Sequence, residues 1–452
     1  MHNTRILGTA NITKLLIKFS APSIVSMGVV ALYNLVDRYF IGLATGSLGL
    51  AGVTIVFPYV LLITAFMMLI STGSTTLISF ALSQKKYDEA EKVVGNTLIM
   101  VILVSLGVTI CSFAFFEDFL RLFGASETVF PMAKEYFYII VWGTIFLGIS
   151  LGLNACMRSE GHANTSMLTM IAGGVINLIL NPVLVFGLHM GIAGAAIATV
   201  IGQAFSAFVT IWFFIGGKSN IKFRIKHLNP DWKMISKISA IGSAQFFLQL
   251  GTCVVTIVYN NALSKSGGDL AVSGVGVVNN IAAMIFMPIT GIGQGMQPIL
   301  AYNFSAGNYD RVKRILREAL FFAGLITTFG FLIAEIMPQS LVWAFNSKDE
   351  NFIKFAAHSM RILFMVYPII GLQIILAEYF QATGRGLSAA ILSLSRQVIA
   401  LIPTVILFSL IWGIEGVLYA APVSDIIAFI IAAFYFYFER KRLNRGPTNE
   451  LV

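Results

Sequence analysis

The stretch ALYNLVDRYFIG, residues 31–42, places Asp37 within an apolar run long enough to cross a membrane. A carboxylate at membrane depth is costly, so it must have a partner or a task. Arg38 is its sequence neighbour, but adjacent helical positions point about 100° apart and cannot easily share a face. Tyr33 and, less closely, Asn34 lie on the Asp37 face. We therefore expect these three side chains to look into a polar interior. Pairing with Arg38, or a wet position near the outer interface, is the alternative.

A matching set of polar groups follows in the fifth and sixth apolar segments. In GGVINLILNPVLVFG, Asn177 and Asn181 are four residues apart and share a helix face, and Pro182 removes a backbone donor, which can free a carbonyl. Thr199 adds a hydroxyl oxygen. Carboxylate, amide and hydroxyl oxygens together suit a proton or a small hard cation. The alternative is that the two asparagines only bond across helices.

Polar residues in the C-terminal half form a less regular pattern. Gln245 and Gln249 share a face of the seventh segment, and we expect both to line a cavity. Glu378 and Asp425 lie within or near apolar segments. We interpret Arg396 as a side chain that reaches toward the cytoplasmic interface.

Catalytic and metal-binding patterns are missing from the sequence. The five histidines are scattered near segment ends, and Cys111, Cys156 and Cys253 show no paired spacing. There is no nucleophile motif, zinc spacing or phosphate-cradling loop. The sequence thus argues against an intramembrane enzyme and against ATP-driven transport. We expect no cofactor, and no metal beyond a Na⁺ at Asp37 if Na⁺ is the coupling ion.

Composition fixes the class of protein. The 452 residues are 57% hydrophobic and 11% charged, with a mean hydropathy of +0.84, whereas a soluble domain carries about 25% charged residues. The apolar runs are continuous and about twenty residues long, which predicts helices and not a β-barrel. We therefore predict an all-α polytopic membrane protein. Its twelve spans are expected near residues 19–41, 52–80, 93–116, 133–156, 165–187, 192–215, 238–263, 272–303, 318–343, 357–381, 388–411 and 416–438.

The basic residues predict the orientation. Of the 30 Lys and Arg, 22 fall in the two tails and alternate loops, 6 fall on the opposite side and 2 fall within spans. This excess predicts that both termini face the cytoplasm of a cell whose plasma (inner) membrane holds the protein. The formal charge of +9 is then an orientation signal, and we expect no nucleic-acid partner. The N-terminus shows no pattern of a cleaved signal peptide.

The two halves of the chain repeat one another. LAGVTIVFP (50–58) aligns with VSGVGVVNN (272–280), and SQKKYDEAEKV with SAGNYDRVKRI and GIAGAAIA with GIEGVLYA align at the same offset of 222. Parallel six-span repeats of this kind enclose a cavity between them. We predict an N-terminal lobe at 1–215, a cytoplasmic linker at 216–237, a C-terminal lobe at 238–439 and a cytoplasmic tail at 440–452. Two pseudo-symmetric lobes around a central cavity favour a transporter.

The sequence resembles the multidrug and toxic compound extrusion (MATE) transporters over nearly its whole length. The motifs are ALYNLVDRYFIG, CMRSEGHANTSM, NLILNPVLVFG, GIAGAAIATVIGQ and QATGRGLSAA. Each is weak alone, but their order and spacing are specific. Within the family the sequence is most similar to the DinF-like branch, where a carboxylate on the first span works with polar groups of the fifth and sixth spans in cation coupling.

That resemblance implies roles for individual residues. Asp37 matches the carboxylate, Tyr33 lies on its face, and Asn177 and Thr199 match the fifth and sixth spans. Weaker matches are Tyr136 and Asn154 in the fourth span, together with Pro22, where the branch can bend its first span.

One position departs from the branch. Where it usually has an aspartate, giving N-x-x-x-D, this sequence has Asn181. A second acid would disfavour ionisation of the first by like-charge repulsion. Its replacement by a neutral isostere leaves Asp37 more readily ionised, so a two-carboxylate proton scheme does not transfer directly.

We therefore expect a secondary active exporter that exchanges H⁺ or Na⁺ for bulky, cationic, amphipathic, drug-like compounds by alternating access. It should act as a monomer among membrane lipids. The alternative is a lipid-linked precursor flippase of similar two-lobed architecture. Such a flippase should carry a strongly cationic central cavity to hold phosphate, and the span interiors lack a cluster of cations apart from Arg38 and Arg396.

Overall fold

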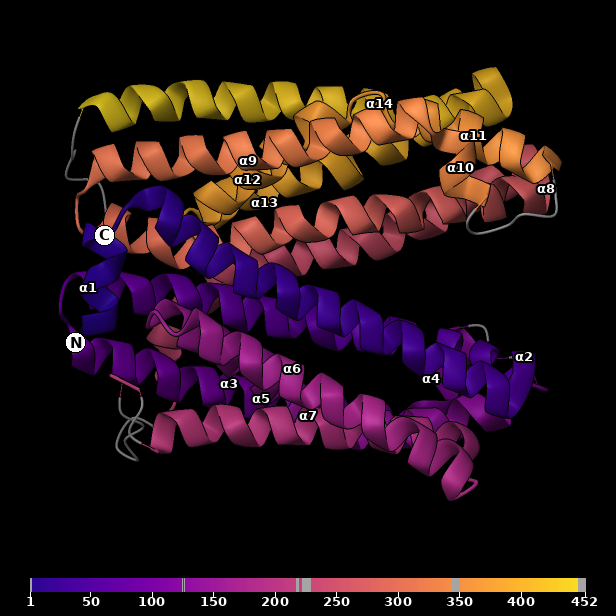
Figure 1. Ribbon diagram of the computed structural model, residues 1–452, viewed down its shortest axis with the longest axis horizontal. Helices are drawn as coiled ribbons and strands as arrows, with labels where there is room; N and C mark the ends of the chain where they lie inside the picture. The colour runs from indigo at the N-terminus through magenta and orange to yellow at the C-terminus, as the bar shows by residue number, and fades with distance from the viewer. Residues whose placement is uncertain are drawn as a thin grey trace. The chain divides into compact units, whose positions relative to one another are not determined.

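The computed structural model describes the backbone of residues 2–123, 125, 127–216, 219–221, 229–343 and 350–445. It describes the side chains of these residues except 2–5, 33–35, 46–48, 264, 269 and 442–445. Among them, every regular element is a helix, as Figure 1 shows. Helices are what the composition requires, because a backbone that crosses lipid must satisfy its own hydrogen bonds.

Helices of the first half run through residue 215. Their bounds are α1 His2–Thr9, α2 Ile12–Ser83, α3 Tyr87–Ala114, α4 Phe116–Leu122, α5 Phe130–Ser159, α6 Ala163–Pro182, the π-helix η1 Val183–Gly187 and α7 Gly191–Ile215. The second half holds α8 Trp232–Ser305, α9 Tyr309–Ile336, α10 Pro338–Trp343, α11 Glu350–Phe364, α12 Tyr367–Ala382, α13 Gly386–Leu394, the π-helix η3 Ser395–Leu401 and α14 Ile402–Arg445.

Several of these helices are longer than one membrane crossing. The 72 residues of α2 would extend about 110 Å, against about 30 Å of bilayer core, and they hold two spans, Ile12–Thr45 and Gly49–Ser83. Non-helical glycines divide two further elements: Gly268 (φ 64°) divides α8, and Gly413 (φ 57°) divides α14. Positive φ is open to glycine at little cost, so the breaks fall there.

The predicted number of spans is confirmed when these breaks are counted. Ten described helical stretches are long and apolar enough to cross a membrane, and α11 with α12, bent by 52°, makes one broken span more. The last of the ten, Gly386–Lys441, has 56 residues and contains the Gly413 break, so it holds two spans. The total within the described residues is twelve, and the all-α polytopic fold is confirmed.

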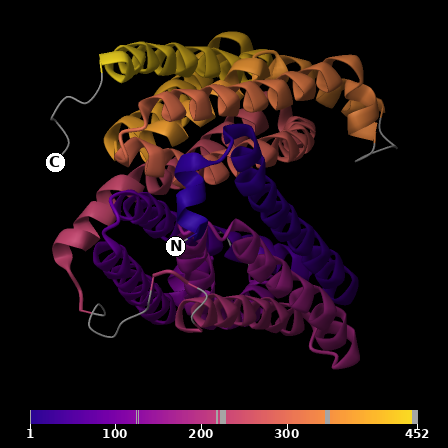
Figure 2. The ribbon, with the colours of Figure 1, turned by 60° about the vertical axis from the view of Figure 1, so that its left-hand side comes forward.

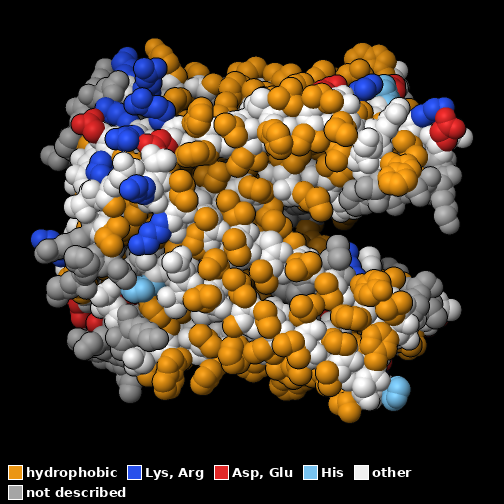
Figure 3. All heavy atoms as spheres, viewed as in Figure 1, with side chains coloured by type: hydrophobic (Ala, Val, Ile, Leu, Met, Phe, Trp, Pro, Cys, Tyr) orange, Lys and Arg blue, Asp and Glu red, His pale blue; other side chains and the backbone are white. Residues whose placement is uncertain are grey.

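The chain forms two compact units. The first unit comprises residues 1–10 and 21–246, and the second comprises residues 11–20 and 247–452. Within the first, α5, α6 and α7 pack side by side, and within the second α9 packs on α12 (Figures 1 and 2). Hydrophobic side chains cover the middle of the helices on the visible face, and most visible Lys and Arg lie at the left of the view (Figure 3).

The units differ from the predicted lobes at two places, and close backbone contacts explain both. The start of α8 belongs to the first unit, because a Cβ added at Gly242 would lie 1.8 Å from the Leu69 carbonyl oxygen. The start of α2 belongs to the second unit, because a Cβ at Gly295 would lie 2.6 Å from the Ser20 Cα. Only glycine permits either approach. The change of unit within α2 falls next to Pro22.

Candidate functional site

Asp37 is buried in the first span and bonds to an amide. Its side chain is 6% exposed, and the Asn181 Nδ2 donates a short hydrogen bond to its Oδ1. Arg38 points elsewhere: its guanidinium lies 5.6 Å from the ring centre of Phe57, and the residue is exposed. Within the described residues the structure shows no Asp37–Arg38 ion pair. The nearest polar partner of Asp37 is neutral.

The fifth and sixth spans meet beside this aspartate. Asn177, one turn before Asn181 on α6, donates from Nδ2 to the Thr199 Oγ1 of α7 at 3.1 Å. The contact depends on two facing glycines, since a Cβ at Gly173 would lie 2.7 Å from the Gly202 oxygen and a Cβ at Gly202 2.6 Å from the Gly173 oxygen. The two backbones therefore touch, and the short Thr199 side chain reaches the amide.

Several oxygens of this cluster have no donor among the described residues. The Asn181 Oδ1 is buried without a hydrogen-bond partner. The Asp37 Oδ2 and the Asn177 Oδ1 also carry no hydrogen bond within the described part of the chain. A buried acceptor without a donor is costly. Such a set of oxygens can hold a proton or a small hard cation, but it cannot stabilise an anion.

Local backbone structure keeps Asn181 in place. Pro182 ends α6, and the chain continues as the π-helix η1, in which the Leu188 N–H bonds to the Val183 oxygen at 2.9 Å. Proline has no N–H, so the regular α-helical pattern is interrupted one residue after Asn181. π-Helical turns are rare and are frequent at functional sites.

Asn154, another predicted residue, makes its hydrogen bonds away from this cluster. Asn154 bonds through Nδ2 to the Ser166 oxygen at 3.0 Å and to the Thr169 Oγ1 at 2.7 Å, and its Oδ1 accepts from Arg158. Thr169 is two helical turns from Asn177, so Asn154 fastens α5 to α6 at another level. Its place among the cavity residues stays a prediction.

The remaining predicted positions are dispersed. Tyr136 is buried on α5 at 6% exposure. Gln245 and Gln249 are half-buried and fall in different units, the first before and the second after the change at residue 246. The side chains of Tyr33 and Asn34 lie outside the described residues.

Sequence reasoning missed an ion pair in the second unit. The Arg396 Nε donates to the Asp425 Oδ1 at 2.6 Å, so this side chain has a charged partner within the second unit. The partner lies on the next span, 29 residues later. Both residues were visible as charges within apolar segments, and that was the signal that could have paired them.

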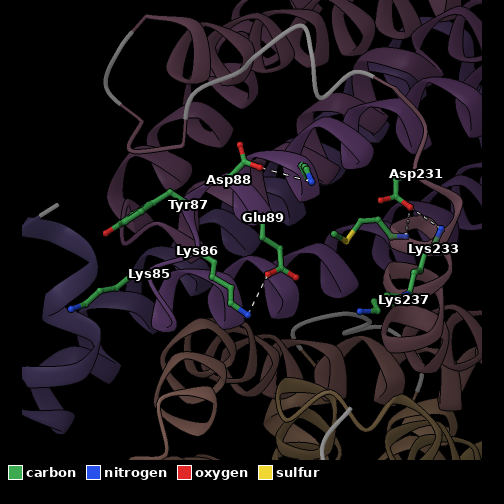
Figure 4. Close-up of a pocket in the computed structure, with 10 residues that line it drawn as sticks. Lys85, Lys86, Tyr87, Asp88, Glu89, Asp231, Lys233 and Lys237 are labelled. Carbon is green, nitrogen blue, oxygen red and sulfur yellow. Dashed lines mark hydrogen bonds and ion pairs between the residues drawn. The ribbon is translucent and has the colours of Figure 1, made fainter.

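A charged pocket of about 650 Å³ lies at one end of the first unit. Figure 4 shows lysine side chains around it, and two of them pair with acids, Lys86 with Glu89 and Lys92 with Asp88. Asp231 starts α8 by accepting the N–H groups of Lys233 and Met234. The lining comprises five lysines and three acids, with Tyr87 and Met234: Lys85, Lys86, Lys92, Lys233, Lys237, Asp88, Glu89 and Asp231. This lining shares no residue with the Asp37 cluster.

Metal-ligating side chains do not gather elsewhere in the described part of the chain. No group of three or more His, Cys, Asp or Glu there could hold a metal ion. The oxygens around Asp37 include one carboxylate only. This donor set is poor for transition metals, which prefer imidazole or thiolate ligands.

Comparison with known proteins identifies the family. The MatE family model matches residues 22–183 and 240–406. The chain belongs to the MatE family. The first matched segment begins at Pro22 and contains Asp37, Asn177 and Asn181, and the second lies in the other half of the chain.

Relatives of this MatE chain match it from end to end. The Multidrug export protein MepA of Staphylococcus haemolyticus is 25% identical over 434 residues, covering 96% of this chain and 95% of the relative. MepA of Staphylococcus aureus is 24% identical over 439 residues, covering 97% and 96%. MatE proteins are transporters, so this multi-pass membrane protein is a transporter and not an enzyme.

Solved structures share the fold. The MATE multidrug transporter DinF-BH, solved as a complex, is 35% identical, with a TM-score of 0.90, covering 96% of this chain and 97% of the other. A MATE transporter in a bent conformation is 20% identical, with a TM-score of 0.92, covering 98% and 99%. The resemblance to MATE transporters and to their DinF-like members is confirmed.

Proposed function

We propose that this MatE transporter exports bulky, cationic, amphipathic compounds in exchange for H⁺ or Na⁺, with Asp37 as the coupling carboxylate. The observation that supports this most strongly is the chemistry around Asp37, a buried acid whose hydrogen-bond partner is a neutral amide. A buried anion without a cation is unfavourable in lipid. A proton, a Na⁺ or a cationic substrate could each neutralise it, and exchange requires that competition.

The relatives support the class of substrate. Those with curated names are multidrug export proteins, and DinF-BH is a multidrug transporter. The single negative charge of Asp37 can be balanced by one positive charge on a substrate. This balance gives the site a simple reason to prefer cationic substrates over neutral or anionic ones. Drug-like cations are thus the substrates of the proposal, and the protein works as a monomer.

Span one is the proposed moving element. Pro22 leaves the carbonyl four residues earlier without its N–H partner, and the Ser26 Oγ bonds to the Pro22 oxygen at 2.8 Å. The change of compact unit falls next to this proline. A bend there would move Asp37 relative to residues 11–20. Binding can drive such a step only through different affinities for the two states.

Gradient-driven efflux tests the coupling role. Purified protein in liposomes should move a fluorescent cation when a pH or Na⁺ gradient is imposed, and Asp37→Asn should abolish this while preserving the fold. Asp118→Asn, which removes an exposed acid of the first unit, is the matched control and should transport normally. Normal gradient-driven transport by Asp37→Asn would make Asp37 only structural.

Both termini are proposed to face the cytoplasm, as the 22 basic residues in the tails and alternate loops suggest. The lysines of the charged pocket would then lie inside the cell. In a cysteine-free background, Lys233→Cys should resist a membrane-impermeant thiol reagent added to intact cells, whereas Lys265→Cys should react. The opposite labelling pattern would reverse the orientation.

A further inference from the structure

The second unit contains a buried ion pair that cation coupling does not use. The Arg396 Nε and the Asp425 Oδ1 are 2.6 Å apart, and the two side chains are 24% and 5% exposed. Burying two charges costs free energy even when they pair. Replacing a buried ion pair by hydrophobic residues often leaves a protein equally stable or makes it more stable. Intramembrane charges of this kind commonly mark a site.

Aromatic rings hold the arginine in a fixed position. The guanidinium carbon lies 5.4 Å from the ring centre of Phe286, and Phe286 packs at 5.3 Å against Tyr367. Tyr367 in turn stacks on Phe364, with ring centres 3.9 Å apart. A guanidinium against an aromatic face is stabilised and cannot swing freely. Phe364 and Tyr367 are buried, so Phe286 is the half-buried ring that lies beside the charge.

The backbone that carries Arg396 has an unusual conformation, and a hydrogen bond from another helix holds it in place. It belongs to the π-helix η3, a rare form that is frequent at functional sites. The next residue, Gln397, accepts a hydrogen bond from the Thr252 Oγ1 of α8 at 2.8 Å. The position of Arg396 is therefore set by three elements: η3, α8 and α14.

We call Arg396, Asp425, Phe286 and Tyr367 the Arg396 cluster. Some donors in and near this cluster have no hydrogen-bond acceptor within the described residues. A guanidinium has five N–H donors, and Arg396 uses Nε only, so within the described residues its Nη1 and Nη2 have no acceptor. The Tyr259 hydroxyl, in a side chain 7% exposed, is buried without a partner. Tyr259 and Tyr367 lie close enough to Asp425 for its charge to act on both hydroxyls.

We propose that this cluster is a substrate subsite in which Arg396 binds a carboxylate or sulfonate of an aromatic amphipathic compound. The proposal rests on the proposed export function and adds a class of substrate to it, compounds with an anionic group. The planar edge formed by Nη1 and Nη2 matches two oxygens of such a group. Asp425 acts as a positioning residue, and the aromatic body of the ligand lies against Phe286.

The charges of the cluster disfavour an anion with more than one charge. Asp425 compensates Arg396, so a monoanion leaves a net charge of about −1 and a dianion about −2. A phosphate dianion or a pyrophosphate would need more cations than the cluster holds. The same arithmetic disfavours a metal cation, because the guanidinium would repel it.

Equilibrium binding of two dyes tests the subsite. The full-length protein in detergent is titrated with a rhodamine ethyl ester and with the same dye as its free carboxylic acid, and fluorescence anisotropy is measured. In the double variant Arg396→Gln/Asp425→Asn, which removes both charges together, the acid should bind at least about ten-fold more weakly than to the native protein. The ester should change less than about two-fold.

Further variants separate recognition from folding. Arg396→Lys keeps the charge but loses the planar fork, so it should weaken binding of the acid and spare the ester. Arg361→Gln removes an exposed arginine of the same unit, paired with Glu335 at 3.8 Å, and should leave both dyes unchanged. If the double variant does not fold, Arg396→Lys decides alone.

Unchanged binding of the acid in a folded variant, or equal loss of both dyes, would overturn the subsite. Failure of the export proposal is distinguishable. In that case Asp37→Asn would keep efflux of the ester, whereas the ratio of acid to ester binding would still depend on Arg396. A subsite that exists without Asp37 coupling would therefore be seen in binding alone.

Discussion

The two repeats of the chain handle buried charge in opposite ways. At the repeat offset of 222, the position of Asp37 corresponds to Tyr259, and the carboxylate of the second unit lies instead on the last span, at Asp425. Asp37 has an amide partner, whereas Asp425 has a guanidinium. In our proposal the first site takes its cation from outside, whereas the second carries its own. Under that proposal one charge is open to exchange and the other is already compensated.

Removing single partners should give opposite changes in stability, and this is the largest effect we expect. Arg396→Gln leaves Asp425 buried without a cation, which should lower the free energy of unfolding by about 3 to 5 kcal/mol. Asp37→Asn removes a buried charge without leaving another one unpaired, so Tm should stay the same or rise. Thermal unfolding in detergent measures both. A large fall of Tm in Asp37→Asn would remove the contrast between the sites.

The control for that comparison is the double variant Arg396→Gln/Asp425→Asn. It removes both charges, so its stability should return to within about 1 kcal/mol of the native protein. If the double variant is as unstable as Arg396→Gln, the loss comes from packing of the arginine stem and not from an unpaired charge.

The same contrast recurs between two glutamates near span ends. Glu439 is held by Arg385, whose Nη2 lies 2.6 Å from Oε1, and by the Tyr379 hydroxyl at 2.7 Å. Among the described residues no cation pairs with Glu160, which accepts from the Ser219 Oγ at 2.7 Å and from the Asn220 N–H at 2.8 Å. Burial raises the pKa of Glu160 from 4.5 to about 7, against the lowering effect of these hydrogen bonds.

Glu160 should therefore make stability depend on pH. Because its folded pKa is raised, the unfolded chain loses this proton first, so stability should fall as pH rises from 4.5 to about 7. The loss is at most about 3 kcal/mol. Glu160→Gln should flatten the dependence of Tm on pH in this range. Glu117→Gln, at an exposed glutamate, should leave it unchanged. An identical slope in Glu160→Gln would contradict the raised pKa.

Asn181→Asp tests the importance of the neutral partner of Asp37 in the first unit. It places two carboxylates in hydrogen-bond contact, and their repulsion should keep one proton bound to higher pH than in the native site. The pH dependence of transport should shift upward by about one unit, and Na⁺ dependence should change with it. Asn154→Asp adds an acid next to Arg158 instead and should not shift the profile. If Asn181→Asp leaves both dependences unchanged, Asn181 does not act on Asp37.

The smallest effect is expected at Thr199. Thr199→Val keeps the shape of the side chain but removes the acceptor of the Asn177 amide, which is worth about 1 kcal/mol. The apparent affinity for the coupling cation should fall a few-fold, and Thr199→Ser should restore it. Equal affinities in all three proteins would place Thr199 outside the cation site.

Local patterns in the sequence predicted the spans and one helix face. Apolar runs gave the crossings, and the four-residue spacing of Asn177 and Asn181 placed both amides on the side of α6 that meets its neighbours. The pairing of Asp37 with the fifth span came from resemblance, since the two residues are 144 positions apart. Spacing along one helix cannot reveal a contact between distant spans.

Tertiary packing explains what the sequence did not reveal. Arg396 looked like a side chain near an interface because its partner is on another span. Asn154 looked like a cavity residue, but Ser166, Thr169 and Arg158 satisfy its amide. The bounds of the compact units depend on backbone contacts at Gly242 and Gly295, which hydropathy does not detect.

The most direct test of the central claim is the ion that a cationic substrate displaces. Purified protein in weakly buffered detergent solution is mixed with a cationic dye, and proton release is measured with a pH indicator, with bound ²²Na⁺ counted in parallel. We predict that each bound dye displaces about one H⁺ or one Na⁺ from the native protein and none from Asp37→Asn. Displacement that persists in Asp37→Asn, or native binding without any displacement, would contradict Asp37 as the exchange site.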